Sequence, residues 1–187
     1  VIERRYFMSL VGMSKEELRT KKRTAFEKFT RAVENVAGED SLIVKHFPSS
    51  SCSLNTVRNH LQTIRNRFGF FPDLIIVDYG DLIVPSRKYD DRRHELSQIF
   101  YGLRDLAGEH DATLWTATQT NRTGAKNNKN SEDLITMVDL AECFDKAAIA
   151  DVILTINQTL DEKRDNAARA FFAKNRDDTS GVVAEIS

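Results

Sequence analysis

Three groups of polar residues, far apart in the sequence, lie at the ends of stretches that predict β-strands. Asp78 directly follows the apolar run 74–77, Gln119 follows a second run, and Lys174 and Arg176 lie two positions apart near the C-terminus. Ligands bind beyond the carboxyl ends of the strands in open α/β sheets. A carboxylate for hydrated Mg²⁺, an amide for a terminal phosphate and a pair of cations are the groups that phosphoryl transfer needs.

Each of these residues also has a purely structural interpretation. Asp78 alone is equally well explained as the cap of a turn, and Gln119 as a polar residue at the end of a strand. Lys174 and Arg176 fit a surface hairpin with one charge pointing each way. Their occurrence together and in this order is more specific than any one of them, so we keep phosphoryl transfer as the leading hypothesis.

The pattern of apolar residues predicts the elements that position these groups. The β-branched run 74–77 predicts a strand buried on both faces, as in parallel sheets, and 113–118 predicts a second buried strand. We expect helices at 14–38 (opened by a capping box at Ser14), 53–69 and 92–107, and further strands at 41–47, 150–157, 170–174 and 182–186. Between them we expect a loop at 80–91, a mobile polar segment at 121–133, a charged hairpin at 161–166 and a turn at 177–181. The order predicts an α/β fold with a mostly parallel central sheet, antiparallel strands at the C-terminal edge and helices on both faces.

Composition limits the class of protein. The 187 residues suffice for a sizeable core, and 41% hydrophobic with 29% charged residues is typical of soluble globular proteins. The net charge of −1 gives no electrostatic argument for nucleic acid. No apolar run approaches the ~18 residues of a membrane span, and the start has no signal-peptide core. Cys52 and Cys143 fit no paired motif, which predicts reduced thiols and a cytoplasmic location. The missing initiator Met leads us to expect a piece of a longer chain.

Four segments resemble, in order, motifs of the DnaB-type hexameric replicative helicases, above all those of bacteriophages. Segment 74–79 resembles the Walker B run, and 114–122 is similar to the next motif, whose Gln senses the γ-phosphate. Segment 137–142, leading to Asp151, resembles the one that presents a DNA-contacting loop to the central channel. Segment 172–176 matches a Lys-x-Arg pattern whose Arg is an arginine finger for the neighbouring subunit. The resemblance implies one partial RecA-like ATPase domain over 1–187, without its first strands and phosphate loop.

The resemblance also implies residue roles. Asp78 would orient Mg²⁺ through a water beside ATP or another NTP, and Gln119, Lys174 and Arg176 would complete the catalytic set. The nucleotide-binding set adds Arg122 to these four residues. The implied DNA-binding residues are Lys126, Lys129, Glu142 and Lys146.

The sequence departs from the family pattern in ways that change the expectations. No Gly-x-x-x-x-Gly-Lys-Ser/Thr phosphate loop occurs, and Glu3 does not stand at the position of the catalytic Glu, although Arg5 resembles an Arg downstream of it. We therefore expect residues 1–187 alone to be inactive. Ala141 and Phe144 stand where relatives carry Arg and Gly, which shifts the expected DNA contacts to backbone amides or nearby lysines.

The implied activity is NTP-driven translocation on single-stranded DNA with duplex unwinding. The implied partners are identical subunits in a hexameric ring, a primase and a helicase loader, in the host cytoplasm and without a membrane. Two alternatives stay open. One is another RecA-like ATPase, a recombinase or clock-type protein. The other is a degenerate, non-catalytic interaction module. A phosphate loop and a Glu encoded upstream of Val1 would separate the helicase from the degenerate module.

Overall fold

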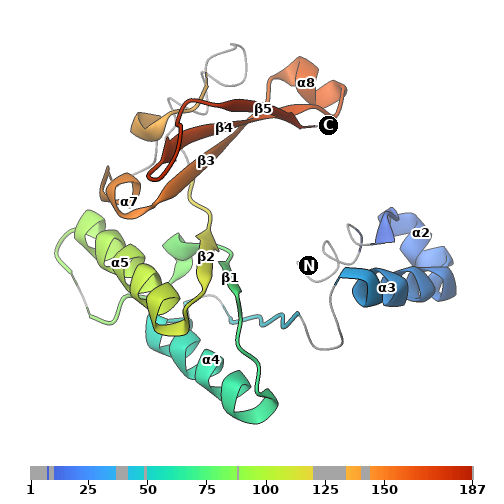
Figure 1. Ribbon diagram of the computed structural model, residues 1–187, viewed down its shortest axis with the longest axis horizontal. Coiled ribbons are helices and arrows are strands. Elements are labelled where there is room, and N and C mark those ends of the chain that lie inside the picture. Colours follow the sequence, from blue (N-terminus) through green and yellow to red (C-terminus); the bar gives the residue numbers. More distant parts are fainter. Residues whose placement is uncertain are drawn as a thin grey trace. The chain divides into compact units, whose positions relative to one another are not determined.

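The computed structural model describes residues 8, 11–36, 42–48, 50–87, 89–119, 134–139 and 144–186. The chain divides into two compact units, Val1–Phe47 and Pro48–Ser187, which we describe separately (Figure 1). The prediction that residues 1–187 form a single partial domain therefore stays a prediction. Within the described residues, none of the helices is long and apolar enough to cross a membrane.

Among the described residues of the first unit are the helices α2 (Lys15–Thr20) and α3 (Lys22–Val36). The predicted capping box is confirmed, because Ser14 accepts a hydrogen bond from the Glu17 amide while Glu17 accepts one from Ser14. The prediction of one continuous helix is wrong, since Lys21 leaves the helical conformation and separates the two. Val11, Met13 and Ala25 form a small buried cluster.

The predicted strand at 41–47 is also wrong, since residues 42–47 form no strand. Leu42 and Val44, the apolar residues that suggested it, are exposed. An extended segment becomes a strand only through a partner, and this one has none among the described residues.

The second unit begins with α4 (Leu54–Phe68) and continues through β1 (Leu74–Val77), the 3₁₀ turn η1 (Gly80–Leu82), α5 (Arg92–His110) and β2 (Thr113–Thr116). The predicted helix at 53–69 is confirmed, because Ser53 caps α4 and Gly69 ends it in the left-handed conformation. The predicted end of the third helix was too early, because Gly108 stays helical and Asp111 adopts the left-handed conformation instead. The predicted loop at 80–91 contains the η1 turn.

The chain then forms η2 (Met137–Asp139), α7 (Phe144–Ile149), β3 (Val152–Asn157), α8 (Leu160–Arg164), β4 (Ala168–Asn175) and β5 (Val183–Ile186). The predicted charged hairpin at 161–166 is wrong, because Thr159 and Glu162 form a capping box that starts the short helix α8. The C-terminal strands and the turn between β4 and β5 are confirmed.

The strands form two sheets. β1 pairs with β2 in parallel, and β3, β4 and β5 form an antiparallel sheet in chain order (Figure 1). The mixture of parallel and antiparallel strands confirms the predicted fold class. Among the described residues no strand pairing joins the two sheets, so the expected single central sheet is not formed by these strands.

The prediction that β1 and the 113–118 strand are buried on both faces is wrong. Ile75 is buried, but the side chains of Ile76 in β1 and Trp115 in β2 are each 58% exposed. α5 covers one face (Figure 1). Its residues Ile99, Phe100 and Leu103 pack with Val77 and Leu114. The described part of the chain places no element over the other face, which explains the exposure.

Candidate functional site

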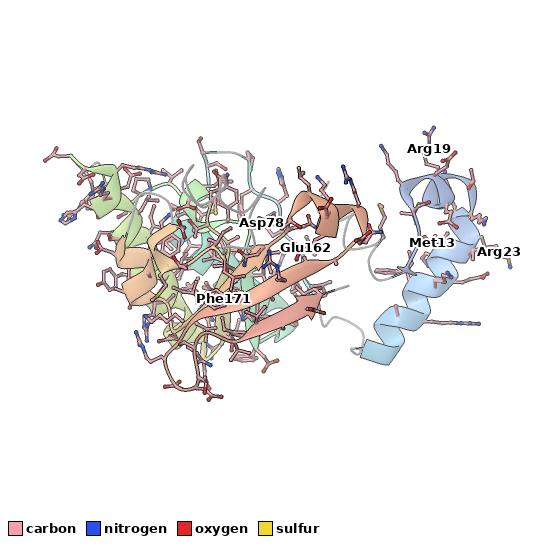
Figure 2. All side chains as sticks on the ribbon, turned by 90° about the horizontal axis from the view of Figure 1, so that it is seen from above. Met13, Arg19, Arg23, Asp78, Glu162 and Phe171 are labelled. Atoms are coloured by element: carbon pink, nitrogen blue, oxygen red, sulfur yellow. The ribbon has the colours of Figure 1, made fainter. Side chains whose placement is uncertain are left out.

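The carboxyl ends of β1 and β2 lie at the same edge of the parallel sheet. Val77 pairs with Thr116, so Asp78 and Gln119 both follow the strands at this edge. Asp78 is exposed, and Gln119 Nε2 lies 3.2 Å from the hydroxyl oxygen of Tyr79, the residue after Asp78. The structure therefore brings two of the predicted site residues to one edge. Figure 2 shows the Asp78 side chain within the second unit.

The turn after β1 is fixed by Thr116. Its hydroxyl accepts a hydrogen bond from the Gly80 amide at 2.8 Å and donates one to the Val77 carbonyl at 2.9 Å. A Cβ at Gly80 would lie 3.1 Å from Leu103 and from Thr116 Oγ1, so a larger residue would crowd this turn. Both interactions hold the backbone that carries Asp78, and the sequence did not reveal either.

A buried charged cluster lies beside this edge. Lys146, from α7, is only 3% exposed and forms an ion pair with Asp81 Oδ1. Thr118 Oγ1 donates to Asp81 Oδ2 at 2.8 Å and accepts from Lys146 Nζ at 2.9 Å. The Lys146 ammonium also lies 5.1 Å from the centre of the Phe100 ring. The cluster ties the residue before Gln119 to α7.

Lys174 lies at the other end of α7. Lys174 Nζ donates to the carbonyls of Ala147 and Ala150 at 2.7 Å and of Ala148 at 3.2 Å. A cation is favourable at a helix C-terminus, where carbonyls lack intrahelical partners. Burial, together with the charges of Arg176 and Arg104, lowers the pKa of Lys174 below its usual value, while Asp151 opposes the shift.

Arg176 lies beside Lys174 and is half exposed. Arg176 Nη1 lies 2.6 Å from Asp151 Oδ1, and Nη2 donates to the Ala148 carbonyl at 3.3 Å. Arg104 of α5 binds the same Asp151 oxygen at 2.9 Å. No hydrogen bond or ion pair among the described residues joins this cluster to Asp78 or Gln119. The described catalytic candidates thus form two groups, Asp78 with Gln119 and Lys174 with Arg176.

Comparison with known proteins identifies the family. A family model described as DnaB-like helicase C terminal domain matches residues 2–185. This chain belongs to that family. It is 34% identical over 121 residues to the DnaB-like replicative helicase of Enterobacteria phage T4, a match that covers 63% of this chain and 24% of the phage protein.

Two solved structures have the same fold as the DnaB-like domain. One, described as an ATPase domain, has a TM-score of 0.72 at 21% identity, covering 98% of this chain and 64% of that one. A DnaB-like replicative helicase, solved to show its interactions with primase, has a TM-score of 0.70 at 21% identity, covering 96% of this chain and 43% of that one. The DnaB-like domain thus spans less than two thirds of each of these relatives.

Most of the residues predicted to contact DNA lie outside the described residues, namely Lys126, Lys129 and Glu142. The same holds for Arg122, which was predicted to contact the nucleotide. Lys146 is described, and its burial and ion pair with Asp81 contradict a direct contact with DNA. We therefore remove Lys146 from the predicted DNA-binding set of the DnaB-like domain.

Two buried polar side chains hold Ile135, two residues before the segment 137–142 that resembles the family's DNA-contacting region. Asn157 Oδ1 accepts a hydrogen bond from the Ile135 amide at 2.7 Å, and Thr155 Oγ1 donates to the Ile135 carbonyl at 2.9 Å. Asn157 is fully buried. Because both backbone groups of Ile135 are bound, this residue is held against β3. Nothing in the local sequence pattern indicated this.

The Asp78 carboxylate is compatible with a bound magnesium ion. Among the described residues, no group of three or more His, Cys, Asp or Glu side chains could hold a metal ion. No Lys or Arg side chain of the described residues forms an ion pair with Asp78. Mg²⁺ usually keeps several waters and binds one or two carboxylates together with substrate phosphates. A single exposed carboxylate fits this mode and does not fit an all-protein metal site.

Proposed function

We propose that this chain is part of a replicative DNA helicase that couples NTP hydrolysis to translocation on single-stranded DNA and duplex unwinding. The observation that carries the proposal is the separation of the candidate catalytic residues in a DnaB-like helicase domain. Asp78 and Gln119 lie at one edge of the parallel sheet, whereas Lys174 and Arg176 lie together at another place in the domain. A ring of identical subunits needs this division, because each nucleotide lies between two chains.

The roles follow from the groups and their surroundings. Asp78 would hold Mg²⁺, which would supply positive charge to the phosphates of ATP or another NTP. Gln119, oriented by the Tyr79 hydroxyl, hydrogen-bonds the γ-phosphate. Arg176 stabilises charge that develops in the transition state on the neighbouring subunit's nucleotide. Its exposed guanidinium would exchange Asp151 for phosphate when a neighbour docks.

Lys174 has a different role in the proposal. Its ammonium group is bound to three backbone carbonyls near the end of α7, so it fixes β4, and with it Arg176, against this helix. Lys174 then acts first as a positioning residue, and as a phosphate ligand only if these contacts open.

Further parts of the proposal concern the full-length protein. Six identical subunits form the ring, a primase and a loader are partners, and the protein works in the host cytoplasm. Residues 1–187 alone are inactive, because they contain no phosphate loop. The solved DnaB-like helicase with primase supports a primase partner by family likeness.

Subunit mixing tests the proposal sharply. In the full-length protein, Asp78→Asn and Arg176→Ala should each be unable to sustain hydrolysis. We expect Arg176→Ala to lower the rate about 10³-fold or more and to keep its affinity for nucleotide. Mixed rings of the two variants contain interfaces where an intact Asp78 faces an intact Arg176. We expect such mixtures to recover hydrolysis and unwinding. Mixtures as inactive as the single variants, with ring formation verified, would contradict the assignment of Arg176 to the neighbour's nucleotide.

A further inference from the structure

The short helix α7 connects the two groups of site residues within one chain. Lys146 in its first half is bound to Asp81 and Thr118, and Thr118 directly precedes Gln119. Backbone carbonyls at its C-terminal end accept hydrogen bonds from Lys174 and Arg176. A displacement at the Gln119 edge is thus passed to α7 by one set of polar contacts and from α7 to Arg176 by another.

The contacts at the start of α7 form a closed set of three residues. Lys146, Asp81 and Thr118 each contact the other two, and Lys146 is buried. A buried ammonium that lost its carboxylate would leave two uncompensated charges, which is strongly unfavourable. Lys146 therefore has to follow any movement of Asp81 and Thr118, and it moves α7 with it.

The contacts at the end of α7 fix the position of the arginine. The carbonyls of Ala147, Ala148 and Ala150 hold Lys174 Nζ, and the Ala148 carbonyl also accepts from Arg176 Nη2. Asp151, one residue further, binds the guanidinium and accepts the Arg176 amide at its own carbonyl, at 3.0 Å. A shift of α7 displaces all of these acceptors together.

We propose that Lys146 is a positioning residue that couples Gln119 to Arg176 of the same chain through α7. The proposal rests on the proposed function, in which Gln119 faces the subunit's own nucleotide and Arg176 faces the neighbour's. Occupation of one site then changes the readiness of the next site to hydrolyse. The consequence is cooperative hydrolysis around the ring, and the cooperativity depends on Lys146.

The test replaces the ion pair in the full-length protein. Asp81→Leu with Lys146→Met removes both charges together, a change that buried ion pairs often tolerate without loss of stability. A purely structural pair would leave the double variant fully functional. Thr118→Val is the second variant, because it removes only the bridging hydroxyl. The matched control is Arg58→Met with Glu109→Leu, which removes an ion pair of 2.7 Å between α4 and α5 that does not touch α7.

Three quantities are measured. The first is affinity for a non-hydrolysable ATP analogue without DNA. The second is the Hill coefficient of ATP hydrolysis on single-stranded DNA. The third is hydrogen exchange in peptides covering residues 144–151, with and without the analogue.

We expect wild type and control to show a Hill coefficient above one and an analogue-dependent change of exchange in 144–151. The Asp81/Lys146 double variant should keep its nucleotide affinity and lose both signals. Coupling between sites typically changes affinity by about 5- to 150-fold, so the loss of cooperativity is measurable. Thr118→Val should weaken both signals in the same direction.

The outcomes separate this inference from the proposed function. If cooperativity and the change in hydrogen exchange persist both in the Asp81/Lys146 double variant and in Thr118→Val, Lys146 has no coupling role. A wild type that neither hydrolyses ATP nor binds single-stranded DNA would overturn the proposed function. In that case hydrogen exchange in residues 144–151 still tests the coupling role of Lys146. An analogue-dependent change that is lost in the Asp81/Lys146 double variant supports this role, and the absence of any such change in the wild type overturns it.

Discussion

Replacing Thr116 with Val should loosen the turn that carries Asp78, because one hydroxyl serves two backbone groups of this turn. The variant leaves the buried Gly80 amide without its acceptor, which costs about 1–3 kcal/mol, and removes the donor to the Val77 carbonyl, worth about 0.5–1.5 kcal/mol. The sum is about 1.5–4.5 kcal/mol. Since each 1.4 kcal/mol is a factor of ten, local opening should increase by roughly 10- to 1,600-fold.

Hydrogen exchange measured by mass spectrometry on a peptide covering residues 78–83 of the full-length protein reports this opening directly. Thr116→Ser is the matched control, because it keeps the hydroxyl and loses one methyl group, worth about 1 kcal/mol or less. Hydrolysis should fall in the Val variant and stay near wild type in the Ser variant. Exchange at the wild-type rate in Thr116→Val would refute the role of this hydroxyl in holding the turn.

Three further predictions concern the two groups of site residues and the segment before α7. Gln119→Ala should lose the stimulation of hydrolysis by single-stranded DNA, whereas Gln98→Ala, at an exposed position of α5, should behave as wild type. Full stimulation in Gln119→Ala would contradict the sensor role. Burial and the neighbouring guanidinium of Arg176 lower the pKa of Lys174 in the folded protein. Between this lowered pKa and the usual value of 10.5, the unfolded chain binds more protons than the folded chain, so the free energy of unfolding rises with pH. Urea midpoints measured up to pH 10.5 should therefore rise less steeply in Lys174→Met, and an unchanged slope would argue against this cause. Asn157→Leu leaves a backbone amide of the 134–139 segment without its acceptor and should lower the free energy of unfolding by about 1–3 kcal/mol in urea titrations, with wild-type midpoints as the contrary result.

Local patterns in the sequence were sufficient to predict the edge that carries Asp78 and Gln119. Two apolar runs ending in polar residues predict parallel strands whose carboxyl ends meet, and the structure places both residues at one edge. The capping boxes at Ser14 and Ser53 are local as well, because donor and acceptor lie three residues apart. The same signal was present at Thr159 and Glu162, where it was overlooked among the charges of α8.

The failures arise where distant residues decide the outcome. Lys146 is a residue type that usually lies at the surface, and its burial is favourable because it pairs with Asp81, 65 residues away in the sequence. Ile76 belongs to an unbroken apolar run, yet burial of a strand on two faces requires a second covering layer, which the described chain does not provide. The end of a helix depends on the backbone conformation of a single residue. In α5 this residue is Asp111, which adopts the left-handed conformation, whereas Gly108, of the type that adopts it most readily, stays helical.

Hydrolysis of ATP by the full-length protein, with magnesium and with or without single-stranded DNA, tests the central claim most directly. The proposed function predicts a low rate that single-stranded DNA strongly increases, and the increase should disappear in Arg176→Ala. A rate near zero under both conditions, in protein whose sequence includes a phosphate loop, would contradict the motor function and favour a degenerate ATPase domain kept for interactions.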